Sequence, residues 1–386
     1  MTFQKSDAYT PLLYYKDVPL VETKEYNFLG NIIDFKGNFK RAVQELSKKA
    51  MKVLFTLKSR FTDFHSIPID LSCKLFDTLI RPVLLYNCEI WFMDEYLSIF
   101  RSLNRSNRNG SSFDILALED KLIFEKIHHK FCKSVLGIKK TACNIAAKSE
   151  LGRLPLTSFI KTQVLMYFTR INLNDINPLV KEAFNVNKIL HNSGMYSWYT
   201  FACSIAEENN INPSECHSDR TFNQIKNRVK NKLKTEIIHN YKTKTLDKLS
   251  KVNDESKLFL YSHLKSDVNM EEYLSQNNSF KNRQMLTKFR LSDHGLKIET
   301  GRYQNIPREQ RLCNICSEID NEDHFFLNCR INNPIRNEFL ENIISVNPDF
   351  SQNMLPFQKL KFILDPKLEL LPYVCDFIKQ SLELRK

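Results

Sequence analysis

Residues 39–61 read FKRAVQELSKKAMKVLFTLKSRF, and the spacing of their apolar side chains decides the local fold. The apolar residues recur at steps of three and four: Phe39, Val43, Leu46, Ala50, Val53, Leu54, Leu57 and Phe61. This is the period of one face of an α-helix, so the stretch is predicted to form one long amphipathic helix. Four cations fall outside that face: Lys40, Lys48, Lys49 and Lys52. The helix is therefore expected to carry a basic side that faces solvent.

The same helical period returns along most of the chain. It marks residues 71–83, 123–135, 160–171 and 222–237, with Pro82 expected to bend or break the helix at 71–83 and Gly137 expected to end the helix at 123–135. Only 8 of the 386 residues are glycine, which disfavours small barrels and sandwiches with many tight turns. Residues 8–35 instead contain short aromatic or branched runs that predict a hairpin.

The predicted fold class is therefore mainly α, with a short β-hairpin at the N-terminus, a helical bundle-like middle and a small metal module near the C-terminus. Polar runs at 101–112 and 207–217 are predicted loops, the run 276–282 is a predicted boundary, and 360–384 is predicted to form one or two small helices. The best apolar stretch, 79–93, is interrupted by Arg81, Pro82 and Glu89, so no membrane span is expected.

The positive charge of the chain is concentrated in two places. The formal net charge is +12, yet residues 36–60 hold 8 Lys or Arg and one acid, and residues 220–251 hold 10 Lys or Arg and 2 acids. The second segment carries its cations around an apolar stripe: Lys226, Arg228, Lys230, Lys232 and Lys234. Such concentration is typical of a surface that contacts phosphates. Solvated helix faces, an acidic membrane surface or a calmodulin-type partner are the other interpretations.

One segment of the sequence contains cysteine and histidine residues at the spacing of a metal-binding site. Cys313, Cys316, His324 and Cys329 form the pattern C-x2-C-x7-H-x4-C. Three thiolates and one imidazole suit a tetrahedral Zn²⁺, and four protein ligands leave no open position for water, so one structural zinc is predicted. His324 and Cys329 are out of register on an ideal helix, so a bend is expected near Asn328. The alternative is that these are ordinary buried thiols and a packed histidine.

Other motifs point away from catalysis or remain ambiguous. The sequence contains no phosphate-binding glycine loop, no nucleophile elbow, no H-E-x-x-H motif and no Asp-Asp doublet. His128, His129 and Cys132 share one predicted helix, where packing is the simpler explanation. Arg302, Arg308 and Arg311 precede the cysteine cluster and are candidates either for phosphate contact or for a solvated loop. We therefore expect no enzymatic activity and no small-molecule substrate.

Several short words of the sequence resemble the carboxy-terminal part of a non-LTR (LINE-type) retrotransposon reverse transcriptase. Met1-Thr2-Phe3 resembles the strand after the catalytic Asp-Asp box, and Tyr26-Asn27-Phe28-Leu29-Gly30 resembles the segment that ends the palm. The stretch from Leu75-Phe76-Asp77 to Trp91 is similar to a family segment that has Gly where this chain has Asn87. Further similar words are Phe131-Cys132-Lys133, Glu150 to Leu156, Lys288-Phe289-Arg290 to His294, and Glu299-Thr300-Gly301-Arg302-Tyr303 before the Cys-Cys-His-Cys knuckle.

The resemblance covers roughly residues 26–336 and implies a sequence of six segments. These are 1–37, an end-of-palm-like β segment; 38–66, a thumb-like basic helix; 67–200, a helical connector; 201–282, a basic helical region; 283–345, the zinc-knuckle module; and 346–386, a helical tail. The whole family protein carries an endonuclease and a polymerase that copies element RNA from nicked DNA. The fingers, palm carboxylates and endonuclease have no counterpart here, so no catalytic residue is transferred.

Together these features predict a non-catalytic, nucleic-acid-binding C-terminal fragment of such a reverse transcriptase. Its expected partners are the RNA or DNA backbone, including element RNA in a ribonucleoprotein, and not a membrane. The alternative is a helical protein, stabilised by zinc, with a structural or protein-interaction role. Ten cysteines without a secretory signal favour reduced thiols, so an intracellular location, nucleus or cytoplasm, is expected rather than secretion.

Overall fold

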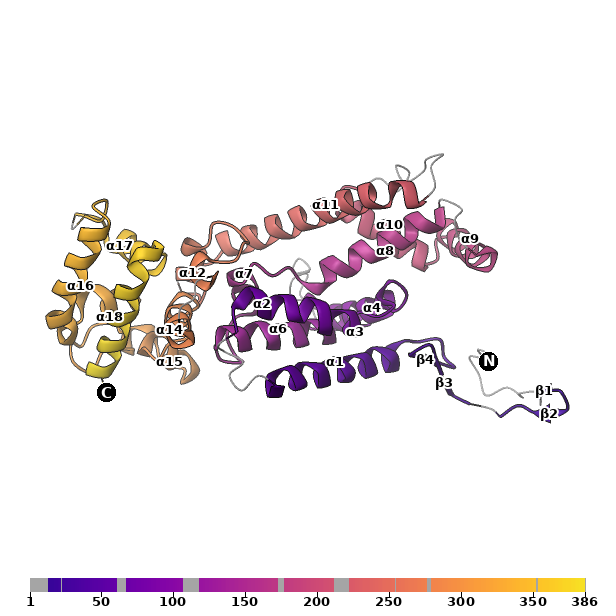
Figure 1. Ribbon diagram of the computed structural model, residues 1–386, viewed down its shortest axis with the longest axis horizontal. Helices are drawn as coiled ribbons and strands as arrows, with labels where there is room; N and C mark the ends of the chain where they lie inside the picture. The colour runs from indigo at the N-terminus through magenta and orange to yellow at the C-terminus, as the bar shows by residue number, and fades with distance from the viewer. Residues whose placement is uncertain are drawn as a thin grey trace. The chain divides into compact units, whose positions relative to one another are not determined.

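The structure is a computed structural model that describes residues 13–21, 23–60, 67–106, 118–172, 177–211, 222–253, 255–275, 279–351 and 353–385 (Figure 1). Of the described residues, 68% are helical, and the strands among them form two short antiparallel hairpins near the N-terminus. This confirms the predicted fold class. Among the described residues, no helix is both long enough and apolar enough to cross a membrane. Residues 1–3, which resemble the strand after the catalytic Asp-Asp box, lie outside the described residues.

The two hairpins are short and do not pair with each other. Strand β1 (Tyr14–Tyr15) pairs with β2 (Val18–Pro19), and β3 (Glu25–Phe28) pairs with β4 (Asn31–Asp34) in the register Phe28 to Asn31. The β3–β4 turn consists of Leu29 and Gly30, both with positive φ (48° and 87°), as a two-residue type I′ turn requires. The Tyr86 hydroxyl donates a hydrogen bond to the Leu29 carbonyl at 3.1 Å, which ties this turn to the helices.

The chain divides into two compact units that interleave in sequence. Unit 1 comprises residues 1–61, 75–128 and 155–241, and unit 2 comprises 62–74, 129–154 and 242–386. Three helices pass from one unit into the other: α2 (Ile69–Leu75), α6 (Ile123–Leu136) and α11 (Phe222–Ser250). The arrangement differs from six consecutive segments because returning stretches of chain, such as 129–154, pack with much later ones.

Unit 1 is a stack of helices in which α4 lies between α1 and α8 (Figure 1). Its helices are α1 (Lys40–Arg60), the π-helix η2 (Phe76–Ile80), α3 (Arg81–Leu84), α4 (Cys88–Ser106), α8 (Leu156–Asn172), α9 (Pro178–Asn192) and α10 (Trp198–Glu208). The rings of Phe92, Phe124 and Phe201 meet edge to face at its centre. Helix α8 is buried on nearly every side, so it forms the core of this unit.

Unit 2 holds the chain from residue 242 onward together with two earlier stretches, 62–74 and 129–154. Its helices are α7 (Asn144–Glu150), α12 (Phe259–Leu264), α13 (Glu272–Ser275), α14 (Phe280–Arg290), α15 (Lys297–Tyr303), η4 (Arg308–Gln310), η5 (His324–Asn328), η6 (Arg330–Asn332), α16 (Asn333–Val346), α17 (Pro356–Leu364), η7 (Leu368–Leu370) and α18 (Leu371–Leu384). The fully buried ion pair Arg290–Glu150, 2.6 Å between Nε and Oε1, joins α14 to the end of α7.

Several predicted boundaries are confirmed and others are corrected. Helix α6 ends before Gly137, whose φ of +67° lets the Ile138 amide bond back to the Lys133 carbonyl at 3.1 Å. The break considered at Pro82 is not observed: Pro82 lies in the first turn of α3 (Arg81–Leu84), and helical backbone continues through it from the π-helix η2. The predicted loop at 101–112 is wrong for its first half, because α4 continues to Ser106. Its remainder lies outside the described residues.

The predicted boundary between residues 282 and 283 is also corrected. It falls inside α14, which begins at Phe280 behind the N-cap Ser279, whose side chain accepts a hydrogen bond from the Asn282 amide. The polar residues of this run that were expected to separate segments therefore include the start of a helix. Residues 276–278 of the same run lie outside the described residues.

Candidate metal centre

The Cys313–Cys316 segment folds as a tight hairpin turn that directs its two sulfur atoms to one side. The Cys313 amide donates to the Glu318 carbonyl at 2.7 Å, and the Ser317 amide donates to the Cys313 carbonyl at 3.0 Å. Ser317 closes the turn with a φ of +57°. Burial opposes ionisation of the Cys313 thiol, but hydrogen bonds from the Ile315 and Cys316 amides outweigh it and lower its pKa. The lowered pKa favours the thiolate, which is the form in which cysteine binds metal ions.

His324 and Cys329 are brought into register by a π-helix. Residues His324–Asn328 form η5, in which the Cys329 amide bonds to the His324 carbonyl five residues earlier at 2.7 Å. The wider turn corrects the mismatch that an ideal α-helix would leave between these two ligands. The predicted bend is real, but the chain leaves the helix at Cys329 itself (φ −60°, ψ 122°) rather than at Asn328.

The imidazole of His324 is oriented by Glu318, an acidic residue of the knuckle turn. Glu318 Oε2 lies 2.9 Å from His324 Nδ1, so Nδ1 carries the proton and donates to the carboxylate. The other ring nitrogen, Nε2, is buried and has no hydrogen-bond partner among the described residues. A buried nitrogen lone pair without a donor fits a metal ligand, and a carboxylate on the opposite nitrogen is the usual support for one.

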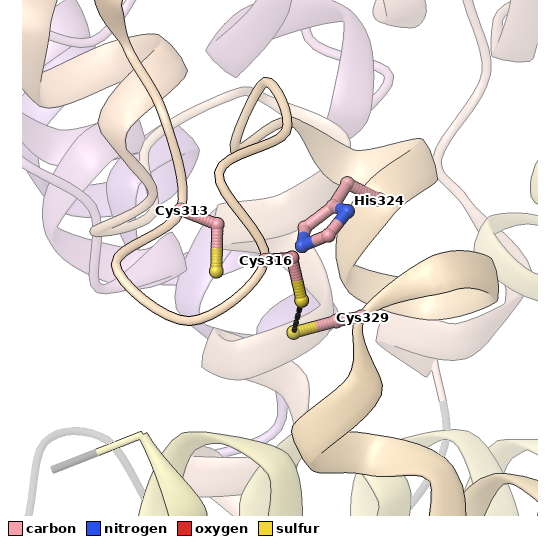
Figure 2. A group of neighbouring side chains, drawn as sticks. All are labelled: Cys313, Cys316, His324 and Cys329. Atoms are coloured by element: carbon pink, nitrogen blue, oxygen red, sulfur yellow. Dashed lines mark hydrogen bonds between the residues drawn. The ribbon is translucent and has the colours of Figure 1, made fainter.

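The four side chains converge on a common point, as Figure 2 shows. Their ligand atoms all lie within 4.8 Å of one another, and the Cys316 and Cys329 sulfurs are 3.9 Å apart. A tetrahedral ion with metal–sulfur bonds near 2.3 Å places its sulfurs about 3.8 Å apart. Three of the four residues are buried and Cys316 is half-buried. Cys313, Cys316, His324 and Cys329 could therefore hold one metal ion.

Polar groups outside the cluster stabilise its sulfur atoms. The Arg330 amide donates to Cys316 Sγ at 3.3 Å. Burial raises the pKa of the Cys329 thiol, and the neighbouring Arg385 guanidinium opposes that increase. Glu318 and Arg385 are functional neighbours that the sequence pattern did not identify. Neither stands at ligand spacing, and Arg385 is 56 positions from Cys329 in the chain.

The three arginines before the cysteine cluster lie around helix α15 and are largely occupied within the protein. Arg311 donates from Nε to the Ile306 carbonyl (2.8 Å) and from Nη1 to the Ile298 carbonyl (3.0 Å). Arg302 donates from Nε to Glu299 at 3.0 Å. Arg308 lies half-buried in η4. These contacts favour packing of α15 as the role of Arg302 and Arg311.

The predicted cations of both basic helices are exposed, but the two helices do not form one surface. In α1, Lys40, Lys48, Lys49 and Lys52 are all exposed, opposite a buried face formed by Val43, Leu46, Ala50 and Leu54. Helix α1 packs on α3 and α4, whereas α11 is tied to the end of α10 by Asn240, which donates to the Glu208 carbonyl at 2.9 Å. In Figure 1, α8 lies between α1 and the part of α11 that belongs to unit 1, so the two basic helices run along different sides of that unit.

Helix α11 presents the more concentrated row of charge. Its buried positions repeat every four residues: Leu233, Ile237, Tyr241, Thr245 and Leu249. Its exposed cations are those predicted: Lys226, Arg228, Lys230, Lys232 and Lys234. Lys226, Arg228, Lys230 and Lys234 form no ion pair with any residue that the structure describes. The side chains of Phe222 and Ile225, predicted to extend the apolar stripe, lie outside the described ones.

The candidate Cys/His group of α6 is packed inside the protein. His128 and Cys132 are fully buried, and the His128 ring stacks on Phe76 with centroids 5.2 Å apart. Glu125 Oε2 lies 3.4 Å from His128 Nδ1, and Glu125 Oε1 accepts the Thr157 amide at the start of α8 at 3.0 Å. These contacts hold the helices of unit 1 together, in agreement with the packing interpretation.

No protein-family model, curated protein or solved structure matches this chain. Function therefore has to be inferred from two local features of the molecule. These are the metal-ligand cluster of unit 2 and the exposed cations of α11 and α1.

Proposed function

We propose that this protein binds the sugar-phosphate backbone of RNA or DNA through the exposed cations of α11, with α1 as a second contact surface. The observation that supports the proposal most is the row Lys226, Arg228, Lys230 and Lys234, which is exposed and has no internal ion-pair partner among the described residues. Phosphate contacts release counterions and give affinity without sequence specificity. We propose that this binding role is non-catalytic, which is what the resemblance to the C-terminal part of a LINE-type reverse transcriptase implies.

We further infer that the metal ion of the Cys313–Cys329 cluster is Zn²⁺ and that it is structural. Three thiolates and one imidazole favour Zn²⁺ over the hard ions Mg²⁺ and Ca²⁺. With four protein ligands, no position is left for a reacting water. The ion would supply folding free energy to the module, since its ligands converge only in the folded chain.

The experiment that tests the nucleic-acid proposal compares two charge-removal variants of the full chain. The first carries Lys226→Gln, Arg228→Gln, Lys230→Gln and Lys234→Gln on α11. The matched control removes four other exposed cations, with Lys188→Gln, Lys281→Gln, Lys361→Gln and Lys367→Gln, and so changes the net charge equally. Binding to a fluorescent single-stranded RNA is measured by anisotropy at one fixed salt concentration.

The α11 variant is expected to bind the RNA at least about tenfold more weakly, because each lost phosphate contact removes a counterion-release contribution. The control variant is expected to stay within about threefold of the wild type, because only its long-range charge has changed. Equal losses in the two variants would show that net charge alone attracts the RNA. Unchanged binding in the α11 variant would contradict the proposed surface.

A further inference from the structure

The metal-ligand turn is part of the hydrophobic core of unit 2. Phe325 and Phe326 lie between the ligands His324 and Cys329, and both are fully buried. Phe326 stacks on Phe377 of α18 with ring centroids 5.7 Å apart, and Phe377 stacks in turn on Phe339 of α16 at 4.3 Å. A turn that carries two core aromatics cannot move without disturbing the helices that pack on them.

Two arginines from the later helices reach the same turn. Arg336 of α16 is buried and donates from Nη2 to the Cys329 carbonyl at 2.6 Å and from Nε to the Phe326 carbonyl at 3.0 Å. Arg385, the residue that ends α18, lies over the Phe325 ring with its guanidinium carbon 4.8 Å from the centroid. The turn between His324 and Cys329 is thus held near both of its ends by arginines that follow it in the sequence, Arg336 and Arg385.

Arg385 also links the two halves of the metal cluster. Its Nη1 donates to Asp320 Oδ1 at 2.7 Å, and Asp320 belongs to the chain between Cys316 and His324. The amide of Asp320 bonds to the Arg311 carbonyl at 2.9 Å, which fixes it beside the knuckle turn. The same guanidinium lies beside the Cys329 thiol, and its Nε and Nη2 are buried without an oxygen acceptor among the described residues.

These contacts have an electrostatic consequence for a bound ion. Three thiolates and a neutral imidazole around a divalent cation leave one net negative charge in a mostly buried site. A buried charge is costly unless an opposite charge stands beside it. Two guanidinium groups lie against the cluster: Arg336, whose charge acts on Cys329 and Cys316, and Arg385, whose charge acts on Cys329. Because Arg385 is also paired with Asp320, both guanidinium groups are needed to balance the two negative charges of the ion-bound cluster and Asp320.

We propose that Arg385 completes the metal centre as one of its two charge-balancing neighbours, beside Arg336, so that metal binding and the docking of α18 are one coupled equilibrium. Arg385 is a positioning residue and not a ligand. The cluster is then not a separable knuckle but the centre of a larger unit that includes α16 and α18. This inference rests on the metal site of the proposed function and is independent of nucleic-acid binding.

The first test measures the Zn²⁺ affinity of the full chain by competition with a chromophoric chelator. Arg385→Gln removes the charge and keeps a hydrogen-bonding side chain, and Lys379→Gln removes one exposed charge from the same helix as the matched control. Loss of an outer-shell partner typically weakens metal binding by 10–100-fold. We expect a loss of about that size for Arg385→Gln, a smaller loss for Arg385→Lys, and wild-type affinity for Lys379→Gln. Wild-type affinity in Arg385→Gln would overturn the proposal.

The second test needs no variant and so does not depend on how one folds. Amide hydrogen exchange of the wild-type chain is compared with Zn²⁺ bound and after chelation. The amides of α18 are expected to lose protection on chelation, while those of α8, in the other unit, keep theirs. Unchanged protection of α18 would overturn the coupling. A wild-type chain that holds no zinc would defeat the metal site and this inference together, whereas one that holds zinc without binding RNA would defeat only the nucleic-acid proposal.

Discussion

At the scale of single residues, the backbone conformation and packing at Gly152 explain why this position requires glycine. Its φ is +61°, and a Cβ built on it would lie 2.3 Å from the Met270 amide nitrogen. Leu151, the residue before it, forms an isolated bridge with Met270, so two distant segments approach here through their backbones. Only glycine combines that conformation with that closeness. The glycine of the Glu-Leu-Gly-Arg segment at 150–153 is therefore explained by backbone packing in this chain.

Substitution of Gly152 by alanine is expected to destabilise unit 2 by about 2–4 kcal/mol, from left-handed strain together with overpacking against backbone. The measurement is urea unfolding followed by circular dichroism. Gly194→Ala is the control, because Gly194 has a φ of +74° but no atom within 4 Å of its added Cβ. It should cost only the strain, about 1 kcal/mol. Equal costs for the two variants would show that no backbone contact is present at Gly152.

Cys316→Ser is expected to abolish stoichiometric zinc and to lower the thermal midpoint of unfolding by at least about 5 °C. The reason is that metal binding contributes folding free energy, and even about 2 kcal/mol shifts a unit of this size by about 4–8 °C. Chelation should lower the wild-type midpoint and leave that of Cys316→Ser unchanged. Cys143→Ser, at a half-buried cysteine outside the cluster, should keep both zinc and midpoint. Unfolding of Cys316→Ser at the wild-type temperature would argue against a structural ion.

The ligands themselves were predictable at this scale, and their supporting residues were not. Ligand type and short spacing identify Cys313, Cys316, His324 and Cys329 without any knowledge of the fold. Glu318 is exposed and is one of 44 acidic residues, so nothing in the sequence distinguishes it from the others. Only the geometry of the turn brings its carboxylate within hydrogen-bonding distance of His324 Nδ1. The partner of Cys329, Arg385, is fixed by the docking of α18, which no local pattern encodes.

At the scale of elements, helical period predicted where helices occur but not always which face is buried. The helical period at 71–83 predicts that Leu71, Leu75, Leu79 and Val83 share the buried face. This is wrong at Leu71 and Leu79, which are each 45% exposed. The buried face is instead Ser72, Phe76, Ile80 and Leu84. Both series repeat every four residues, so spacing alone cannot choose between them. The π-helix η2 before Pro82 adds the extra shift in register.

The turn before α4 is also determined at the scale of elements. Asn87 has a φ of +53°, in the left-handed region that glycine adopts freely and that asparagine tolerates better than most other residues. Trp91 then donates from Nε1 to the Tyr86 carbonyl at 2.7 Å across this turn. The expectation that asparagine would give a different local turn from glycine stays a prediction, since either residue can adopt this backbone.

Helices α7 and α14 are joined by a buried polar network whose loss is expected to be severe. Glu150→Gln keeps the shape and the acceptor for the Tyr273 hydroxyl, which donates to Glu150 at 2.7 Å, but leaves Arg290 with less compensating charge. Removing the sole partner of a buried charge costs about 3–5 kcal/mol. Because Arg290 keeps its ion pairs with Glu271 (2.7 Å) and Asp365 (3.3 Å), we expect a cost of about 2–3 kcal/mol here. The exposed pair Asp247–Lys251, also 2.7 Å long, gives the control Asp247→Asn, expected to cost under about 1 kcal/mol. Urea unfolding distinguishes them, and a cost for Glu150→Gln as small as that of the control would contradict a stabilising network.

At the scale of the whole molecule, the sequence predicted helices, a hairpin and two concentrations of charge, but not the assembly of the chain into two interleaved units. Units of this kind depend on contacts between residues far apart in sequence, such as Lys139 with Asp293 or Gln284 with Gly137. Local periodicity carries no information about those pairings. For the same reason, two basic helices that look alike in sequence were not predicted to lie on different sides of unit 1.

The central claim is that exposed cations of this protein contact a nucleic-acid backbone, and it is tested most directly by the salt dependence of binding. The affinity of the wild-type chain for a single-stranded RNA is measured over a range of salt concentrations. Four phosphate contacts along α11 predict a plot of log K against log salt with a slope of about −3, at about −0.7 per contact. A slope near zero, or no binding at low salt, would contradict the claim.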